Sequence, residues 1–261
     1  MRLGLAQMDI VWEESSANMD KCQHFINLAA HNKVEFILFP EMVLTGFTMN
    51  IDKLILQEEE IINWFKDKAI KNNINIGFGY AIKEGTKGSN KFAIVSKDGV
   101  LLANYSKIHP FSYGGEDKKY YAGEEICFCN IQSTKITPFI CYDLRFPEIF
   151  QIASKTSKLI TVAANWPRSR QDHWLTLLKA RAIENQCFIA GINRVGIGDG
   201  IEYGGGSVII SPLGEILNEV NNKEELIVKE IDFTLVNELR DFFSLKKDRR
   251  EELYNKLNNT L

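Results

Sequence analysis

Three residues of different chemical character follow apolar runs of this chain closely, namely Glu41, Lys107 and Cys141. A short apolar run predicts a buried strand. A polar side chain at the end of such a strand is held rigidly and can reach a cleft, so strand ends favour chemistry. If these strands are neighbours, a carboxylate, an ammonium and a thiol converge. The runs in question are residues 36–39, 100–105 and 136–140.

Together these groups are suited to attack on an amide. A thiol needs a proton acceptor to become the reactive thiolate, a developing oxyanion needs fixed positive charge, and an amide leaving group needs a proton donor. Each residue also has an ordinary structural role. Glu41 could cap a helix or form a salt bridge, Lys107 could be a surface charge, and Cys141 could fill the core as most free cysteines do. Their joint placement favours the functional interpretation.

Histidines offer an alternative base. His109 follows Lys107 by two positions, so strand alternation places both on one face, and His173 is a second candidate. No motif sets either histidine in a cysteine-protease context, which favours capping or hydrogen-bonding roles. A redox role for Cys141 lacks a resolving partner at CxxC spacing.

Metal and cofactor chemistry find little support. Cys127 and Cys129 alternate within a predicted strand, a spacing atypical of zinc, which favours core packing. The glycines between residues 196 and 206 open no helix, unlike a phosphate-binding loop, and are expected to form a mobile loop near the site. We therefore expect no metal and no cofactor.

Apolar strands alternate with amphipathic helices in each half of the chain, which predicts two packed sheets with helices outside. The helix with the stripe 19, 22, 26 and 29 would be capped by Ser15 or Ser16. With no linker or low-complexity stretch, residues 1–261 are expected to form a single domain. The other expected helices are 54–71, one from 147, and 173–186. The expected strands are 3–10, 36–39, 74–82, 92–96, 100–106, 126–131, 135–140, 159–164, 188–193, 205–210, 215–220 and 226–231.

The amino-acid composition indicates which classes of partner and which cellular compartment to expect. The chain has 261 residues, of which 45% are hydrophobic and 25% charged, as in ordinary globular proteins. A net charge of -3 gives no electrostatic reason to expect nucleic acid or an anionic membrane as partner. The first ten residues lack the apolar stretch of a secretory signal, and no run reaches spanning length. Five cysteines, an odd number, favour a reducing compartment, so a cytoplasmic location is expected.

The sequence segments around the three candidate residues resemble the catalytic signatures of the nitrilase, or carbon-nitrogen hydrolase, superfamily, and they occur in the same order along the chain. The resemblance covers nearly all of the sequence. The three signatures are Phe39-Pro40-Glu41, Tyr105-Ser106-Lys107-Ile108-His109 and Cys141-Tyr142-Asp143-Leu144-Arg145-Phe146-Pro147-Glu148. Further similar segments are Asn165-Trp166-Pro167, Ala180-Arg181-Ala182-Ile183-Glu184-Asn185-Gln186, Asn193-Arg194 and Ser211-Pro212-Leu213-Gly214-Glu215.

The resemblance implies a role for each residue. Cys141 would be the nucleophile, Glu41 the general base and acid, and Lys107 would hold the oxyanion with the backbone N–H of Tyr142. Glu116 matches the family's second glutamate and would orient Lys107; its neighbour Asp117 is the alternative.

The resemblance also implies an α/β fold, a four-layer α-β-β-α sandwich of the nitrilase type with two pseudo-repeated halves. It implies a homodimer as well. The charge-dense tail of residues 245–261 is then either a solvated helix or an arm that crosses to the partner.

Arginines near the expected pocket favour an anionic substrate. Arg145 lies four residues after Cys141, and Arg168 and Arg170 follow a predicted strand end. Arginine can grip a carboxylate with two hydrogen bonds, although a structural salt bridge is the alternative role. The sequence does not decide which arginine would bind substrate.

Within the superfamily the chain looks most like the omega-amidase branch, which hydrolyses the terminal amide of 2-oxo acids such as 2-oxoglutaramate and 2-oxosuccinamate. Phe47, Phe111 and Trp166 would then be apolar pocket walls, or else core aromatics. Alternatives are another carbon-nitrogen hydrolase, acting on an N-carbamoyl amino acid, another aliphatic amide or a nitrile, and a catalytically silent scaffold. The segments that carry this closer likeness are Thr45-Gly46-Phe47, the Cys141 signature, Asn165-Trp166-Pro167, Arg170, His173-Trp174 and Tyr203-Gly204-Gly205.

Overall fold

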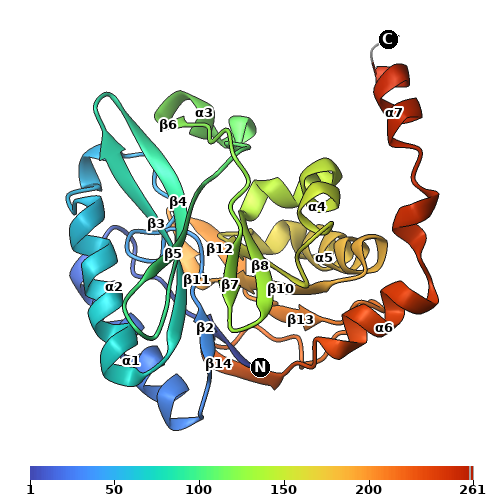
Figure 1. Ribbon diagram of the computed structural model, residues 1–261. Coiled ribbons are helices and arrows are strands. Elements are labelled where there is room, and N and C mark those ends of the chain that lie inside the picture. Colours follow the sequence, from blue (N-terminus) through green and yellow to red (C-terminus); the bar gives the residue numbers. More distant parts are fainter. Residues whose placement is uncertain (259, 261) are drawn as a thin grey trace.

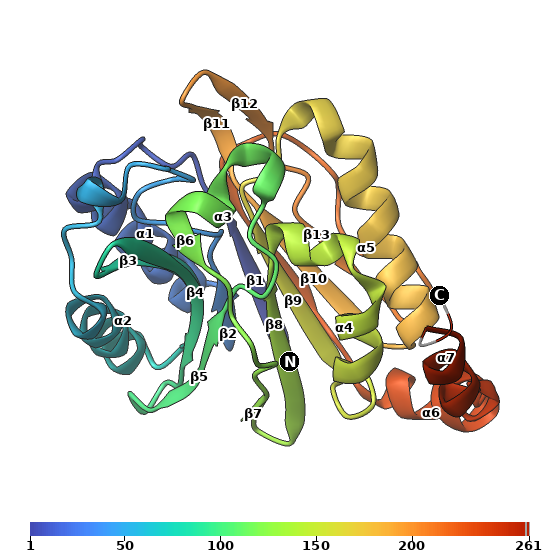
Figure 2. The ribbon, with the colours of Figure 1, turned by 90° about the horizontal axis from the view of Figure 1, so that it is seen from above.

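Two β-sheets lie face to face between two layers of helices in the computed structural model, which describes residues 1–258 and 260 (Figure 1, Figure 2). The first sheet has the order β14 (Glu225–Glu230), β1 (Arg2–Gln7), β2 (Phe36–Leu38), β3 (Asn75–Glu84), β4 (Lys87–Val95), β5 (Leu101–Ser106), with β6 (Tyr120–Tyr121) paired to β4. The second has the order β13 (Val208–Ile210), β10 (Phe188–Asn193), β9 (Leu159–Ala164), β8 (Thr134–Ile140), β7 (Cys129–Ile131). A separate hairpin joins β11 (Val195–Gly198) to β12 (Ile201–Gly204).

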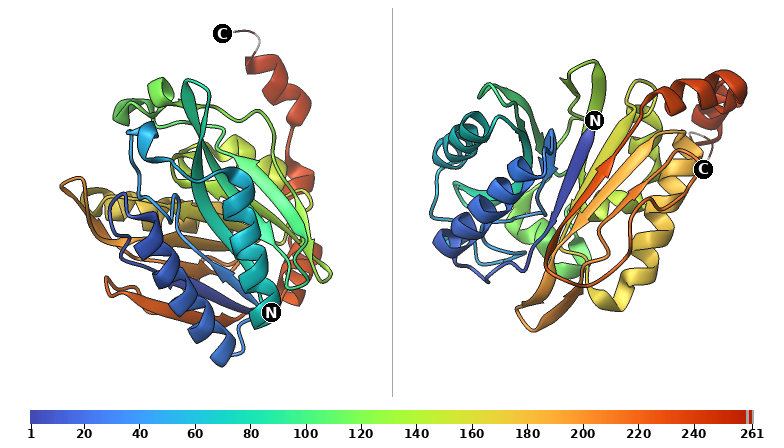
Figure 3. Two further views of the ribbon diagram at one scale, coloured as in Figure 1. Left: turned by 90° about the vertical axis from the view of Figure 1, so that its left-hand side faces the viewer. Right: turned by 90° about the horizontal axis from the view of Figure 1, so that it is seen from below.

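Helices cover the outer face of each sheet, which gives the predicted α-β-β-α order; Figure 3 shows the same layers from below. The first sheet is covered by α1 (Ser15–His31) and α2 (Glu58–Asn72), and the second by α4 (Pro147–Ala153) and α5 (Gln171–Asn185). The remaining helices are α3 (Glu116–Lys119), α6 (Thr234–Phe242) and α7 (Glu251–Asn258). Short 3₁₀ turns are η1 (Ile51–Lys53), η2 (Ser112–Gly114), η3 (Cys141–Arg145), η4 (Arg168–Arg170) and η5 (Leu245–Asp248).

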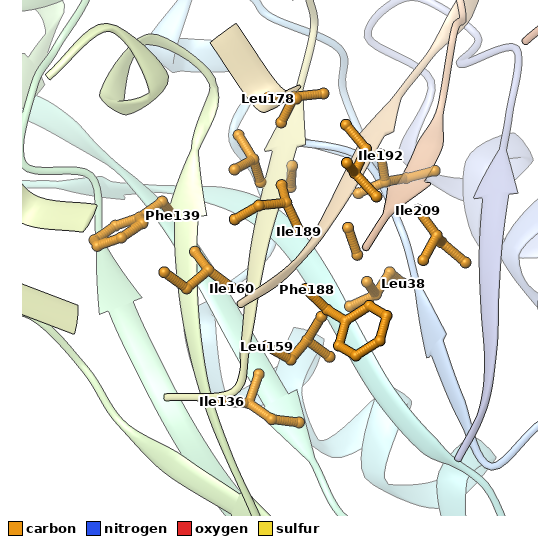
Figure 4. Packing of buried hydrophobic residues seen from close by; sticks show 14 of the residues in the cluster. Leu38, Ile136, Phe139, Leu159, Ile160, Leu178, Phe188, Ile189, Ile192 and Ile209 are labelled. Carbon is orange, nitrogen blue, oxygen red and sulfur yellow. The ribbon is translucent and has the colours of Figure 1, made fainter. Parts of the chain in front are cut away.

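Strand β2 shows why the apolar runs are continuous. Phe36 and Leu38 belong to the core between the sheets, whereas Ile37 and Phe39 belong to the core beneath α1 and α2. Because successive side chains of a strand point to opposite faces, a strand covered on both sides must be apolar throughout. In Figure 4, Leu38 lies among side chains of the second sheet.

The parallel strands aim their carboxyl ends at one edge of the sandwich. β1, β2 and β3 are parallel, as are β8, β9 and β10. β5 is antiparallel to β4, which is antiparallel to β3, so β5 points the same way as β3. In open α/β sheets, the carboxyl ends of the strands border the ligand crevice.

Three local expectations were wrong. Residues 215–220 form no strand, because β13 has three residues and only Ile216 bridges it, at Ile210. Helix α1 begins at Ser15 with Glu14 as its N-cap, and buried Asn18 fixes its entry by hydrogen bonds to both backbone groups of Val11. The expected mobile loop at 196–206 is instead largely the β11–β12 hairpin.

The segment after β14, which leads into the tail, continues along the outside of the second sheet. Arg240 of α6 donates hydrogen bonds to the backbone oxygens of Ser154 and Ser157, just after α4, and α7 extends away from the body in Figure 1. The side chains of Phe242 and Leu257 are 92% and 52% exposed. Of the expected tail, positions 259 and 261 lie outside the described residues. In residues 1–258 and 260, every helix is too short or too polar to span a membrane.

Candidate active site

The three candidate residues meet at the carboxyl edge of the two sheets. Glu41 lies three residues after β2, Lys107 directly follows β5, and Cys141 directly follows β8. Glu41 and Lys107 have 0% and 1% of their surface exposed, and both lie close enough to Cys141 to shift the pKa of its thiol. The strand ends thus bring together a carboxylate, an ammonium and a thiol, as expected.

Lys107 lies between two buried carboxylates. Its Nζ is 2.8 Å from Oε1 of Glu41 and 2.8 Å from Oε2 of Glu116. Glu116 is the first residue of α3 and is fully buried, whereas Asp117 is exposed. The structure therefore places Glu116, and not Asp117, against Lys107. The Phe111 N–H also donates to Glu116, which ties the α3 loop to this carboxylate.

Asn90, in the middle of β4, joins the same cluster. Its Nδ2 donates to Oε1 of Glu41 and to Oε1 of Glu116, each at 2.8 Å. Its backbone oxygen accepts from the N–H of Lys107. Asn90 was not expected here, because a single polar residue inside a strand has no distinctive sequence signal.

Charges determine the protonation of this cluster. Burial alone would lower the pKa of Lys107, but Glu116 and Glu41 raise it well above its usual value. Burial raises the pKa of Glu116, with Lys107 opposing that shift and Glu41 adding to it. Lys107 therefore remains an ammonium, since a buried cation beside two carboxylates is favoured in its charged form.

Cys141 opens the η3 turn in the left-handed region, with φ of +44°. Burial raises the pKa of its thiol well above the usual value, and Glu41 raises it further, against the opposing charge of Lys107. The resting thiol is therefore neutral and requires a base before it can attack. Its Sγ lies 4.0 Å from the backbone oxygen of Asn165.

Asp143 fixes this turn from within. One carboxylate oxygen accepts from the Tyr105 hydroxyl and the Ile140 N–H, at 2.7 and 3.0 Å. The other accepts from the N–H of His109 at 3.0 Å and lies 2.8 Å from its Nδ1. This buried carboxylate joins the segment after β5 to the end of β8, so it fixes Lys107 and Cys141 relative to each other.

The two histidines have other partners. His109 pairs with Asp143 and stacks on Phe146 at a centroid distance of 3.7 Å. His173 is exposed, and its Nδ1 lies 3.2 Å from a guanidinium nitrogen of Arg145. Within the described residues neither ring forms a hydrogen bond with the Cys141 thiol, so the histidines have the hydrogen-bonding role that the sequence favoured.

Glu41 is positioned from both sides. On one side, Oε2 accepts from the backbone N–H of Asn165 at 2.9 Å, while Asn165 Nδ2 donates to the backbone oxygen of Glu41 at 2.7 Å. On the other, Gly79 of β3 lies so close that an added Cβ would be 2.5 Å from the Glu41 Cα. Only glycine permits this approach.

A pocket of about 150 Å³ leads from the surface to Cys141. All five residues expected to contact substrate line it, as does Tyr142. Arg168 does not; it pairs with Glu202 on the hairpin. The expected residues are Arg145, Arg170, Phe47, Phe111 and Trp166. The pocket is also lined by Trp12, Met49, Asp199 and Ile201, which no sequence motif marked, and by Tyr203 of the segment Tyr203-Gly204-Gly205, which was not expected to line it. These residues come from loops and from the hairpin.

Aromatic rings support the pocket's cations. The Arg145 guanidinium lies 5.0 Å from the Trp166 ring, and that of Arg170 lies 5.6 Å from the Phe111 ring. The Phe47 ring lies 5.2 Å from Lys107 Nζ. In the described part of the chain, neither pocket arginine forms an ion pair with a carboxylate. No cluster of three or more metal-ligating His, Cys, Asp or Glu side chains occurs among the described residues.

Comparison with known proteins agrees with this geometry. A family model described as carbon-nitrogen hydrolase matches residues 2–241. The chain is 40% identical over 218 residues to omega-amidase YafV of Yersinia enterocolitica, over 83% of each chain. It is 34% identical to 2-oxoglutaramate amidase of Bacillus subtilis (strain 168), over 95% of this chain and 97% of that protein.

Solved structures confirm the nitrilase-type fold. A CN-hydrolase superfamily protein of Xanthomonas campestris, which holds an arsenic adduct in its active site, has a TM-score of 0.89 and 29% identity, over 95% of this chain and 97% of that one. A carbon-nitrogen hydrolase of Helicobacter pylori G27 has a TM-score of 0.91 at 21% identity, over 98% of this chain and 97% of that one, a likeness of fold alone.

Proposed function

Since this chain belongs to the carbon-nitrogen hydrolase family and is a hydrolase of carbon-nitrogen bonds, we propose that it hydrolyses the terminal amide of a small carboxylate-bearing substrate. The substrate is of the 2-oxoglutaramate or 2-oxosuccinamate type, and the products are the acid and ammonia. The observation that carries the proposal is the position of Cys141 in a small pocket that also presents two arginines, neither of them paired with a carboxylate of the described chain.

The size of the pocket favours a small substrate. A pocket of about 150 Å³ is of the size that a small organic molecule fills, which favours a short dicarboxylic monoamide. Arg145 and Arg170 are the side chains available for its carboxylate, and guanidinium groups bind carboxylates through paired hydrogen bonds. The names of two relatives, an omega-amidase and a 2-oxoglutaramate amidase, agree with this choice.

In the acylation half of the reaction, Glu41 takes the proton of the Cys141 thiol as sulfur attacks the amide carbon. The new C–S bond moves an electron pair to the carbonyl oxygen. Lys107 donates to Glu41 and to both carboxylate oxygens of Glu116. In this step one of its N–H groups turns from Glu116 to the oxyanion, which also accepts from the N–H of Tyr142. Glu41 then protonates the nitrogen, the C–N bond breaks, and ammonia leaves a thioester on Cys141.

Deacylation uses the same carboxylate. Glu41 takes a proton from water, whose oxygen attacks the thioester carbon, and the C–S bond breaks. The carboxylic acid product leaves, and the proton held by Glu41 returns to the sulfur. Asn90, Asn165 and Lys107 hold Glu41 in one orientation during both half-reactions.

A substrate panel tests the proposal. Ammonia release is compared for 2-oxoglutaramate, glutamine, a simple nitrile and an N-carbamoyl amino acid; we expect the highest kcat/KM for 2-oxoglutaramate. A clear preference for the nitrile or the carbamoyl compound contradicts the proposal and supports another carbon-nitrogen hydrolase. Failure of all four favours the silent scaffold.

Arginine variants test the carboxylate site. Arg145→Met and Arg170→Met should each raise KM for the 2-oxo acid amide while changing little for an uncharged amide of similar length. Arg168→Met is the matched control, since Arg168 pairs with Glu202 outside the pocket. Equal effects on charged and uncharged amides would exclude this carboxylate role.

The remaining expectations are proposals of the same kind. A single domain, a homodimer that includes the tail and a cytoplasmic location stay predictions. Exposed apolar side chains occur just before the tail, at Phe242 and Phe243, and within it, at Leu257, and are of the kind that a second copy could cover. Sedimentation of the full chain beside a chain ending at residue 244 tests the tail's part in a dimer.

A further inference from the structure

Asn165 contacts both Glu41 and Cys141 and lines the pocket. It directly follows Ala164, the last residue of β9, and is 4% exposed. Its backbone N–H and side-chain Nδ2 donate to Glu41, and its backbone oxygen faces the Cys141 thiol. Its Oδ1 is buried and has no hydrogen-bond partner among residues 1–258 and 260.

The orientation of this amide is fixed by its neighbours. Nδ2 lies 2.7 Å from the backbone oxygen of Glu41 and 3.4 Å from Oε2 of the same residue. Exchanging Oδ1 and Nδ2 would set oxygen against oxygen, so the nitrogen must face Glu41. Oδ1 is therefore a buried acceptor that requires a donor from outside the protein's own network.

Position distinguishes Asn165 from the residues that carry the other buried unpartnered atoms of the described chain. Asn165 lines the pocket, and the residues that carry the others do not. Those other atoms are Asn90 Oδ1, Thr161 Oγ1, Gln171 Oε1, Gln186 Oε1 and Arg194 Nη1.

We infer that Oδ1 of Asn165 accepts a hydrogen bond from the NH2 group of the scissile amide and selects primary amides over substrates whose leaving group carries no N–H. The substrate's carboxylate and ketone have only acceptor oxygens, so the amide nitrogen is its one donor at neutral pH. With one N–H held by Oδ1, the developing lone pair on nitrogen turns toward Glu41, which protonates it. This inference rests on the proposed function and names the group that recognises the leaving nitrogen.

Asn90 provides a matched control. Both asparagines donate Nδ2 to Glu41 and both have a buried unpartnered Oδ1, but Asn90 lies outside the pocket. Loss of either side chain should disturb Glu41. Only the loss of Asn165 should also remove an acceptor for the amide N–H.

The test is the ratio of kcat/KM for the best primary amide of the panel to that for the methyl ester of the same acid. Both substrates are measured on one preparation, so the fraction of folded enzyme cancels. We expect Asn165→Ala to lower this ratio about tenfold or more, since one hydrogen bond to a buried acceptor is lost. Asn90→Ala should lower both rates and leave the ratio within about twofold of wild type.

If turnover by Asn165→Ala is too slow to measure, the same ratio is measured as Kd in Cys141→Ala protein with and without the second change. A ratio that stays within twofold in Asn165→Ala, or falls equally in Asn90→Ala, overturns the inference. Failure of the proposed function has a different signature: the wild-type protein would then prefer the nitrile or the carbamoyl compound, or hydrolyse none of the panel.

Discussion

Gly79 gives a direct test of how closely Glu41 is positioned. An alanine Cβ at this position would lie 2.5 Å from the Cα of Glu41 and 2.6 Å from the backbone oxygen of Pro40. Ordinary contacts begin near 3.4 Å, so the two backbones must separate by roughly 1 Å. Backbone atoms cannot swing aside as a flexible side chain can, and the carboxylate of Glu41 must move with its Cα.

Gly77, two residues earlier on the same face of β3, is the matched control. There an added Cβ meets side-chain carbons, Leu38 Cδ2 at 2.8 Å and Phe92 Cζ at 3.0 Å. Overpacking costs about 1–3 kcal/mol, so both Gly77→Ala and Gly79→Ala should lower the melting temperature by a few degrees. Only Gly79→Ala displaces Glu41, and a displacement near 1 Å can cost roughly 100-fold in rate.

The assay is ammonia release from 2-oxoglutaramate, expressed per folded protein after thermal melts at the assay temperature. We expect kcat to fall roughly 100-fold in Gly79→Ala and to stay within about threefold of wild type in Gly77→Ala. The reasoning is refuted if Gly79→Ala is as active as Gly77→Ala at equal folded concentration, since Glu41 would then tolerate the displacement.

Three further predictions follow from the charges of the site. Lys107→Met should lower the free energy of unfolding by about 3–5 kcal/mol in urea titrations, because Glu41 and Glu116 lose their buried counter-charge; a loss below about 1 kcal/mol would show that the pair is not buried as described. Asp143→Asn should slow turnover with little change in KM, because an amide NH2 replaces one acceptor of the turn that holds Cys141, and wild-type kcat would argue against this positioning role. Because the pKa of Cys141 is raised, the thiolate absorbance difference between wild type and Cys141→Ala should appear only above pH 9.0, the ordinary pKa of a thiol. A thiolate signal at neutral pH would show that the pKa of Cys141 is lowered and not raised.

The sequence predicted those parts of the site that coincide with strand ends. Glu41, Lys107 and Cys141 each come shortly after an apolar run, and parallel strands carry such positions to one edge of a sheet. The layers were also predictable, since strands buried on both faces must be continuously apolar.

Other features depend on contacts between distant segments. Glu116 and Asp117 are adjacent, equally acidic residues, and only the docking of α3 onto Lys107 buries the first and exposes the second. Asn90 has no sequence signal because its role depends on the register of β4 against β5. The prediction of a strand at 215–220 was wrong because its partner β13 ends after three residues. The sequence of one strand does not indicate how long its partner strand is.

The most direct test of the account is rapid acid quench during turnover of 2-oxoglutaramate, followed by peptide mass spectrometry. We expect the peptide that contains Cys141 to gain the mass of the substrate less ammonia, and Cys141→Ala protein to show neither this adduct nor turnover. An acyl group on a different residue, or turnover by Cys141→Ala at the wild-type rate, would contradict the assignment of Cys141 as nucleophile.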